Sequence, residues 1–164
     1  MRCIGLRDDG FYHYASHQVF PSDKLKKMYI FENIERISYF YGPNVDIILC
    51  SETLNFSIAS NRPGCKNLFL YGPLFKDLGS PNSCRPANIN FMNNYPSADN
   101  GGLYRLDNIE NGETISEPPI PILEGYYFTG WYSEAECINK WSFEVTPTIQ
   151  ENEDLTLFAG WQLL

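Results

Sequence analysis

The chain has 164 residues, of which 43% are hydrophobic and 15% aromatic, so it can bury a core and is not a disordered chain. It contains no run of 18 apolar residues, which excludes a membrane-spanning helix and predicts no membrane insertion by this chain. Its formal net charge of -8 argues against nucleic acid as a partner, because nucleic-acid binders draw most of their affinity from clustered cations.

Charge divides the sequence into two parts. Residues 1–87 carry ten lysines and arginines and eight carboxylates, a net charge of +2, whereas residues 88–164 carry two cations and twelve carboxylates, a net charge of -10. Between them, residues 78–86 are rich in Gly, Pro, Asn and Ser, which interrupt regular structure. We predict two domains, 1–85 and 86–164.

The first ten residues do not resemble a secretion signal. They include Arg7, Asp8 and Asp9 and lack the apolar stretch of 7 to 15 residues that such a signal needs. The protein is therefore either intracellular or a piece of a longer chain. The abrupt ending at residues 161–164 favours a fragment of a larger protein.

Short strands and one short helix are predicted in residues 1–85. Residues 22–28 fit one or two helical turns, with Ser22 as the N-cap and Leu25 and Met28 on a common face. Residues 39–41, 47–49 and 68–70 are apolar or aromatic and fit three successive strands.

Strand patterns dominate residues 86–164. Residues 88–92 alternate polar and apolar, and a loop containing Pro96, Gly101 and Gly102 follows at residues 95–102. Residues 103–106 and 114–115 flank Asn111-Gly112, a dipeptide that suits a type I′ turn, so a hairpin is predicted here.

The remaining C-terminal elements follow an extended proline segment. Pro118, Pro119 and Pro121 remove three backbone donors, so residues 118–121 are not a central strand. Residues 126–132 and 155–161 predict two further strands, and Ser133 is expected to cap a short helical turn through Glu136. The predicted class is β-rich α+β.

Large side chains are expected to form the core of the C-terminal domain, because small domains bury a lower fraction of their surface. Burial of each large aromatic ring contributes roughly 1.5–3 kcal/mol, which favours a core over a ligand platform. The predicted core residues are Tyr126, Phe128, Trp131, Trp141, Phe143, Leu157 and Trp161.

No catalytic, cofactor-binding or metal site is predicted. His13 and His17 are four residues apart, as a helical metal pair requires, but residues 11–14 look strand-like and no third ligand lies nearby. The acidic run 151–154 and the loop at Asp99 lack the twelve-residue calcium-loop pattern, so a solvated acidic turn is favoured.

The cysteines are scattered and odd in number. Cys3, Cys50, Cys65, Cys84 and Cys137 form no C-x-x-C pair and no zinc-finger spacing. Isolated buried thiols are the favoured interpretation for most of them, over a Cys/His nucleophile. The alternative of one disulfide, between Cys65 and Cys84, stays open if the chain is exported.

The C-terminal part resembles the internalin B-repeat, also called the Listeria-Bacteroides repeat, over about residues 88–162. Residues 125–132 read Gly-Tyr-Tyr-Phe-Thr-Gly-Trp-Tyr, and residues 155–161 read Leu-Thr-Leu-Phe-Ala-Gly-Trp. The family pattern is Gly-Tyr-x-Phe-x-Gly-Trp-Tyr, a variable insert, and Leu-Thr-Leu-Tyr-Ala-x-Trp; Phe158 replaces the tyrosine. The resemblance implies a β-grasp-like fold, a place in bacterial surface proteins as a spacer or contact module, and no catalytic residues.

Residues 25–75 show a fainter resemblance to the leucine-rich repeats of surface proteins. It rests on residues 29–37 and on residues 64–70, which read Gly-Cys-Lys-Asn-Leu-Phe-Leu against a pattern of Gly-Cys-x-x-Leu-x-x-Ile. Two interpretations of residues 1–85 stay open: a degenerate end of such a repeat array, or a separate small β-rich domain.

The favoured function is a non-catalytic, extracellular module of a bacterial cell-surface protein. Its expected partners are a host or cell-surface protein or neighbouring repeats, and no cofactor is expected. The alternative is a small hydrolase-like or ligand-binding domain at residues 1–85 with an appended B-repeat. A pocket joining His13 or His17 to a thiol or carboxylate would favour that alternative.

Overall fold

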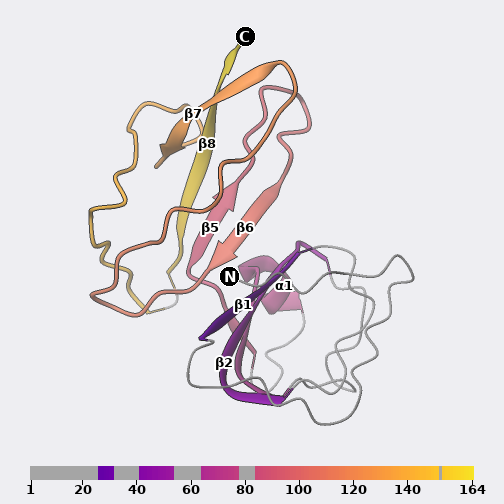
Figure 1. Ribbon diagram of the computed structural model, residues 1–164, viewed down its shortest axis with the longest axis vertical. Coiled ribbons are helices and arrows are strands. Elements are labelled where there is room, and N and C mark those ends of the chain that lie inside the picture. The colour runs from indigo at the N-terminus through magenta and orange to yellow at the C-terminus, as the bar shows by residue number, and fades with distance from the viewer. Residues whose placement is uncertain (1–25, 32–40, 54–63, 78–83, 152) are drawn as a thin grey trace. The chain divides into compact units, whose positions relative to one another are not determined.

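The computed structural model describes residues 26–31, 41–53, 64–77, 84–151 and 153–164. The chain divides into two compact units, Met1–Arg85 and Pro86–Leu164, and each is described here by itself. Within the described residues each unit is built on one four-stranded sheet, and the single helix is α1 (Gly72–Asp77) (Figure 1). The predicted β-rich class is therefore confirmed.

The sheet of the N-terminal unit has its strands in chain order. These are β1 (Lys27–Phe31), β2 (Tyr41–Cys50), β3 (Gly64–Leu70) and β4 (Cys84–Pro86). β2 is parallel to both β1 and β3. In this register Met28 is aligned with Ile47, and Ile47 with Leu68. Ile30 is aligned with Leu49, and the next position along the β2–β3 register brings Leu49 to Leu70.

This alignment builds the core of the unit. In parallel strands, residues that are aligned across the sheet point to the same face. Ile30, Ile47, Leu49, Leu68, Leu70 and Cys84 form one buried cluster, with Met28 and Phe75 packed against it. Two apolar rows thus run across the sheet, and α1 contributes a side chain to the same cluster.

The predictions for this unit are partly confirmed. Strands at 47–49 and 68–70 are present in β2 and β3. Of the strand predicted at residues 39–41, Tyr41 begins β2, and residues 39–40 lie outside the described part of the chain. The helix predicted at 22–28 is wrong at its end, because Lys27 and Met28 belong to β1 and pair with Asp46 and Ile47.

The sheet of the C-terminal unit has the order β6-β5-β8-β7. Its strands are β5 (Ile89–Met92), β6 (Leu103–Asp107), β7 (Tyr126–Tyr132) and β8 (Leu155–Leu163). The central pair β5–β8 is parallel, and the outer pairs β5–β6 and β7–β8 are antiparallel. The strands predicted at residues 88–92, 103–106, 126–132 and 155–161 are confirmed, and so is the loop at residues 95–102.

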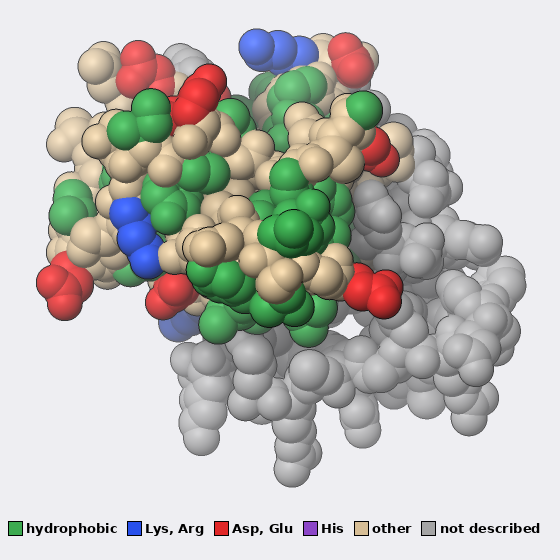
Figure 2. Space-filling view, turned by 90° about the horizontal axis from the view of Figure 1, so that it is seen from above, with side chains coloured by type: hydrophobic (Ala, Val, Ile, Leu, Met, Phe, Trp, Pro, Cys, Tyr) green, Lys and Arg blue, Asp and Glu red, His purple; other side chains and the backbone are tan. Residues whose placement is uncertain are grey.

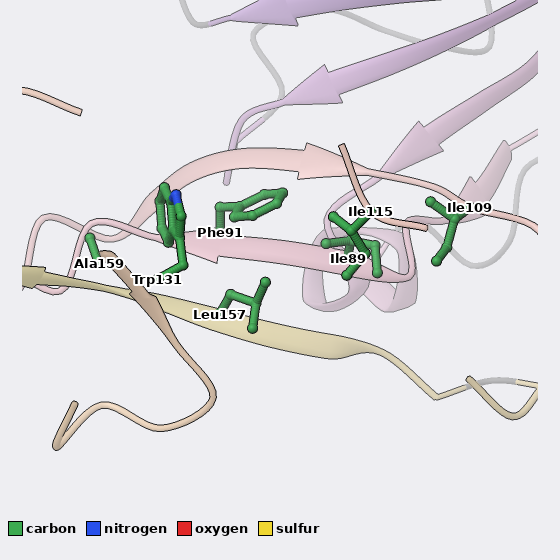
Figure 3. Close-up of a cluster of buried hydrophobic side chains, with 7 residues drawn as sticks. All are labelled: Ile89, Phe91, Ile109, Ile115, Trp131, Leu157 and Ala159. Carbon is green, nitrogen blue, oxygen red and sulfur yellow. The ribbon is translucent and has the colours of Figure 1, made fainter. Parts of the chain in front are cut away.

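The alternating pattern explains which face is buried. Ile89 and Phe91 of β5 and Leu157 and Ala159 of β8 are all fully buried, since residues two apart in a strand point to one face. Figure 3 shows these four side chains together with Trp131 of β7. Ile109 and Ile115 join the cluster from the irregular segment that follows β6.

The predicted hairpin across Asn111-Gly112 is wrong. A turn does form, because Glu113 N donates to Glu110 O at 3.1 Å and Gly112 has a φ of 91°. However, no strand follows it, and β6 pairs with β5. Ile115 is buried in the core, which draws the chain away from β6.

The helical turn predicted at residues 133–136 is also absent. These residues form bends and a turn, closed by Cys137 N donating to Glu134 O at 3.0 Å. Glu134 accepts hydrogen bonds from the backbone N–H groups of Ile138 and Asn139. The carboxylate therefore closes a tight loop, and the helix that Ser133 was expected to cap does not begin.

Candidate functional site

Trp131 lies at the centre of the aromatic cluster. It is 1% exposed, and its ring centroid lies 4.9 Å from that of Phe91 and 5.4 Å from that of Phe128, both in edge-to-face geometry. The ring of Tyr104 lies at 5.8 Å. Such ring pairs contribute about 0.5–1.5 kcal/mol beyond the area that they bury. Trp131 is thus held from several sides and is closed to a ligand.

Two further tryptophans close the cluster at its margins. Trp161 lies 5.9 Å from Phe128 and 5.8 Å from Tyr95, and its indole N–H donates to Asn93 O at 2.7 Å. The backbone N–H of Trp141 donates to Trp131 O at 2.7 Å. This bond fixes the part of the variable insert that carries Trp141 against the outer edge of β7.

The predicted core residues occupy different depths. Trp131 and Leu157 are fully buried, whereas Phe128, Trp141, Phe143 and Trp161 are partly buried and pack against the same cluster. Tyr126 is half-buried near the end of the sheet. The prediction missed the aliphatic part of the core, which consists of Ile89, Ile109, Ile115 and Ala159.

Gly130, a glycine of the family signature, faces Gly160 across β7 and β8. Gly130 is paired with Gly160, beside a register shift between Phe128 and Gly130. A Cβ on Gly160 would lie 2.3 Å from the ring of Tyr132, and a Cβ on Gly130 would lie 2.3 Å from Cε of Lys140. Gly130 also has a φ of 140°, which favours glycine.

Lys140 occupies the space above Gly130. Its ammonium donates to Thr129 O at 2.6 Å, and Lys140 forms an isolated antiparallel bridge with Tyr132. A lysine laid over an edge strand opposes the addition of another strand there. The Gly-Trp-Tyr signature is therefore explained by packing at one strand edge.

Asparagines next to β5 tie the surrounding loops to the sheet. The side chain of Asn88 exchanges two hydrogen bonds with the backbone of Ile109, at 2.9 and 3.0 Å. Asn94, with a φ of 49°, donates to Ala135 O at 3.0 Å and to Ala159 O at 3.1 Å. Sequence reasoning missed these contacts; the only signal was asparagine on both sides of a predicted strand.

Cys137 is the one cysteine in residues 86–164. Burial raises the pKa of its thiol above the usual range, and the charges of Glu134 and Glu136 add to this effect, while a contact with Asn94 opposes it. A thiol with a raised pKa stays protonated at neutral pH and is a poor nucleophile. The carboxyl of Glu134 has a lowered pKa, chiefly because the Ser133 hydroxyl donates to it.

The chemical candidates named from the sequence are not brought together. Over the described residues, no group of three His, Cys, Asp or Glu side chains could hold a metal ion, and this includes Asp99 and the described part of the acidic run 151–154. Cys50 and Cys84 are buried, and the side chain of Cys65 lies outside the described part of the chain, so the alternative bridge from Cys65 to Cys84 stays a prediction. Cys3, His13 and His17 lie outside the described residues.

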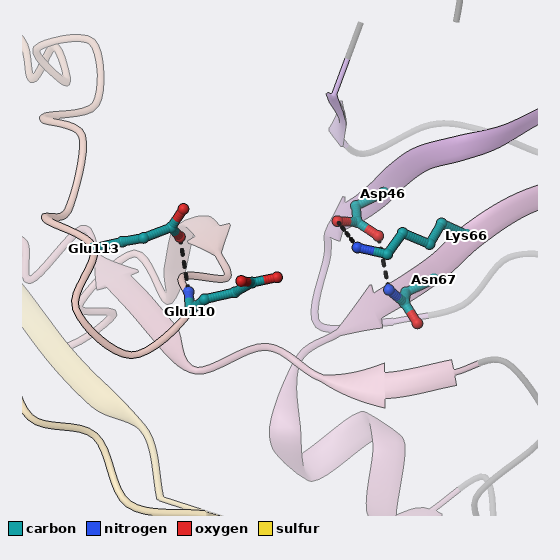
Figure 4. A network of polar contacts seen from close by, with 5 residues as sticks. All are labelled: Asp46, Lys66, Asn67, Glu110 and Glu113. Atoms are coloured by element: carbon teal, nitrogen blue, oxygen red, sulfur yellow. Dashed lines mark hydrogen bonds and ion pairs between the residues drawn. The ribbon is translucent and has the colours of Figure 1, made fainter. Parts of the chain in front are cut away.

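Polar contacts in the N-terminal unit lie on its sheet surface. Asn67 donates to Asp46 at 2.8 Å, and the Lys66 ammonium lies 4.0 Å from the same carboxylate (Figure 4). An exposed ion pair of this kind contributes about 0–1 kcal/mol. Figure 4 also shows the Glu113 carboxylate accepting from Glu110 N at 2.8 Å within the turn after β6. Both contacts support local structure and form no reactive centre.

Residues 89–160 match the family model of the Listeria-Bacteroides repeat domain. The resemblance predicted over about residues 88–162 is thereby confirmed for that segment. The chain is 45% identical over 47 residues to "Internalin H" of Listeria monocytogenes, which is 29% of this chain and 8% of that protein. It is 42% identical over 65 residues to a "Putative membrane protein" of Evansella cellulosilytica, which is 39% of this chain and 9% of that protein.

These relatives are much longer than the segment they share with this chain, which spans less than a tenth of each. Among the described residues, none of the helical structure has the length and apolar character that a membrane span requires. The shared feature is thus one repeat domain, found in an internalin and in a putative membrane protein.

Proposed function

We propose that this chain is a non-catalytic part of a bacterial cell-surface repeat protein, in which the C-terminal unit acts as a spacer or contact module. The observation that carries this proposal is the Listeria-Bacteroides repeat at residues 89–160, whose signature residues are used for packing around Trp131. The names of the relatives, an internalin and a membrane protein, support a surface location.

The strand order supports a β-grasp-like fold for the C-terminal unit. A β-grasp sheet has a parallel central pair flanked by antiparallel partners, and the order β6-β5-β8-β7 has this form. The connection from β6 to β7, residues 108–125, is irregular and carries the proline segment. A four-stranded sheet of this size suits a repeating spacer.

The register of the N-terminal unit supports a degenerate end of a leucine-rich-repeat array. Lys27 is aligned with Asp46 and Asp46 with Asn67, so the aligned positions recur after 19 and then 21 residues. Leucine-rich repeats are 20–29 residues long and stack one parallel strand per repeat, so the second interval lies within this range and the first is one residue shorter. Apolar rows such as Met28, Ile47 and Leu68 are what such stacking buries.

The surroundings of the Cys137 thiol, the candidate nucleophile of the C-terminal unit, support a role without catalysis. Residues 86–164 contain no histidine, so a Cys/His or Ser/His pair within this unit is excluded by composition. The only thiol there has a raised pKa. The hydrolase-like alternative depends on His13 and His17, which lie outside the described residues, and no observation favours it.

Surface location is tested on intact cells of the organism that encodes the chain. Antibodies raised against the 164-residue chain should label unpermeabilised cells, and protease added to those cells should remove the signal. A cytosolic protein probed in parallel serves as the control for lysis. Labelling that appears only after permeabilisation would contradict the proposal.

A further inference from the structure

The sequence contains two Asn-Gly dipeptides, Asn100-Gly101 and Asn111-Gly112, and both lie in the C-terminal unit. Asparagine is a thermolabile residue, because its side-chain amide can be attacked by the backbone nitrogen of the residue that follows. A following glycine leaves this attack unhindered, since it has no Cβ. Whether either dipeptide reacts in the folded chain therefore depends on how the fold holds the asparagine side chain and the glycine nitrogen.

The Asn111-Gly112 dipeptide lies at an open turn. Both residues are exposed, and a Cβ on Gly112 would meet nothing within 4 Å. The bonds that close the turn belong to the flanking residues, because Glu113 N donates to Glu110 O at 3.1 Å and Glu110 N donates to the Glu113 carboxylate at 2.8 Å (Figure 4). Among the described residues, neither the Asn111 side chain nor Gly112 N has a hydrogen-bond partner. No contact opposes their approach.

The Asn100-Gly101 dipeptide is held by its loop. The Asn100 side-chain oxygen accepts from Gly102 N at 3.1 Å, and Gly101 N, the atom that would attack, donates to the Asp99 carboxylate at 3.2 Å. Gly101 is also closely packed, because a Cβ there would lie 2.3 Å from the ring of Tyr95. These contacts must break before the Asn100 side chain can meet Gly101 N. The two dipeptides are thus the same in sequence and opposite in their surroundings.

We propose that Asn111 is a site of spontaneous covalent modification, converted to aspartate and isoaspartate, and that the loop contacts of Asn100 spare that residue. Gly112 N forms a bond to the side-chain carbonyl carbon of Asn111. The bond from this carbon to the amide nitrogen breaks, and the amide nitrogen leaves as ammonia with the proton from Gly112 N. Water then opens the succinimide ring at one of its two carbonyls, giving aspartate or isoaspartate. This inference does not depend on the proposed surface role.

The modification changes the charge and the backbone of the turn. It replaces a neutral amide with a carboxylate between Glu110 and Glu113, whose like charges repel it. Elsewhere the acidic side chains are spread out, and Figure 2 shows Asp and Glu projecting at several separate places on one face of the molecule. Isoaspartate also lengthens the main chain by one methylene, shortly before the buried Ile115. Both products therefore load a turn that leads directly into the core.

The rates are measured by peptide mass mapping of the full 164-residue chain, incubated at physiological temperature and mildly alkaline pH. Exchange of the amide NH2 for OH raises the mass of the peptide that carries the modified residue, and a protein isoaspartyl methyltransferase labels the isoaspartate. Asn100 is the internal reference, because it has the same following residue. Asn111→Gln identifies the signal, because the longer side chain has to form a larger ring and reacts more slowly.

In the folded chain, we expect Asn111 to be converted at least about tenfold faster than Asn100, because Asn100 reacts only after two hydrogen bonds break. In the urea-unfolded chain the two rates should become similar, since these contacts are lost. Asp99→Ala should raise the rate at Asn100 in the folded chain, because it releases Gly101 N. Glu124→Ala is the matched control, since it removes the same charge from an exposed position outside both dipeptides and should leave both rates unchanged.

Three results would each overturn the proposal. The first is equal conversion of Asn100 and Asn111 in the folded chain. The second is a ratio of the two rates that is the same in the folded and the urea-unfolded chain, because the selection would then come from the local sequence and not from the fold. The third is an Asn111 amide that stays intact in the folded chain while it reacts in urea, because the turn would then protect it. None of these results bears on surface labelling of cells, so failure of the proposed function would be recognised separately.

Discussion

Leu157→Ala tests the packing of the C-terminal unit at its centre. Leu157 is 0% exposed, lies in the parallel pair opposite Phe91, and belongs to the cluster around Trp131. The strand register holds the neighbouring side chains in place, so they collapse poorly into the cavity that Leu157→Ala leaves. The substitution should therefore lower the free energy of unfolding by about 2–5 kcal/mol, the range for buried leucines cut back to alanine. A unit spanning Pro86–Leu164 has a total stability of roughly 4–12 kcal/mol, so the loss is a large share of it.

Urea unfolding followed by tryptophan fluorescence measures this effect in the full chain. All three tryptophans, at positions 131, 141 and 161, lie in the C-terminal unit, so their emission reports on that unit and not on residues 1–85. Ile138→Ala is the matched control, because this side chain is 74% exposed and its truncation should change stability by less than about 0.5 kcal/mol.

A small effect of Leu157→Ala on the free energy of unfolding would contradict close packing around this side chain. If Leu157→Ala lowers the free energy of unfolding by less than about 1 kcal/mol, the side chain is not in a close-packed interior. Equal effects of Leu157→Ala and Ile138→Ala would lead to the same conclusion. A variant that no longer shows a folded baseline at all would agree with the upper end of the expected range.

Four further outcomes are expected. Gly160→Ala should lower the stability of the unit by about 1–3 kcal/mol in the same urea assay, because its Cβ would lie 2.3 Å from the ring of Tyr132; a neutral effect would contradict that contact. Asn94→Ala should lower the stability of the unit by about 1–3 kcal/mol, because it removes the hydrogen bonds to Ala135 O and Ala159 O and places alanine at a φ of 49°. Asn94→Gly should lower stability less, because glycine adopts that φ without strain. Equal losses of stability in the two variants would mean that the backbone conformation plays no part. The pKa of Glu134 is lowered in the fold, so its contribution to stability is present above the ordinary glutamate pKa and is lost as the pH falls through the lowered value. Glu134→Gln should therefore make the free energy of unfolding depend less on pH in acid. An unchanged dependence on acid pH would argue against the turn that Glu134 closes. Alkylation of Cys137 in the folded chain, followed by peptide mass mapping, should rise at a higher pH than in the urea-unfolded chain, because burial raises the pKa of its thiol; coinciding profiles would contradict the burial.

Strands with a local alternating or aromatic pattern were predictable from the sequence. Alternation in residues 88–92 and 155–161 gave the two central strands of the C-terminal sheet, and the aromatic run at 126–132 gave an outer one. Ile89 and Phe91 of β5, and Leu157 and Ala159 of β8, lie two residues apart, so a local period of two carries the information. Trp131 and Leu157 were predicted core residues because small domains rely on large side chains, and both are fully buried.

Features that depend on contacts distant in sequence were not predictable. The Asn111-Gly112 turn forms without its hairpin, because Ile115 packs in a core built from strands that are distant in the chain. Ile89 is 26 residues before Ile115, and Leu155 is 40 residues after it. Lys27 and Met28 suit a helix by propensity but pair in register with β2. The loop contacts of Asn94 join residues 41 and 65 positions away, and no local pattern encodes such a distance.

The exchange of the Trp131 indole proton with solvent deuterium tests the central claim most directly. The indole nitrogen is buried and has no hydrogen-bond partner among the described residues, so exclusion of water alone should protect it. In the folded 164-residue chain, we predict exchange as slow as that of the core amides of β8, which requires unfolding of the unit. Exchange at the rate of a solvent-exposed indole would contradict an aromatic core and, with it, the account of this unit as a packed spacer.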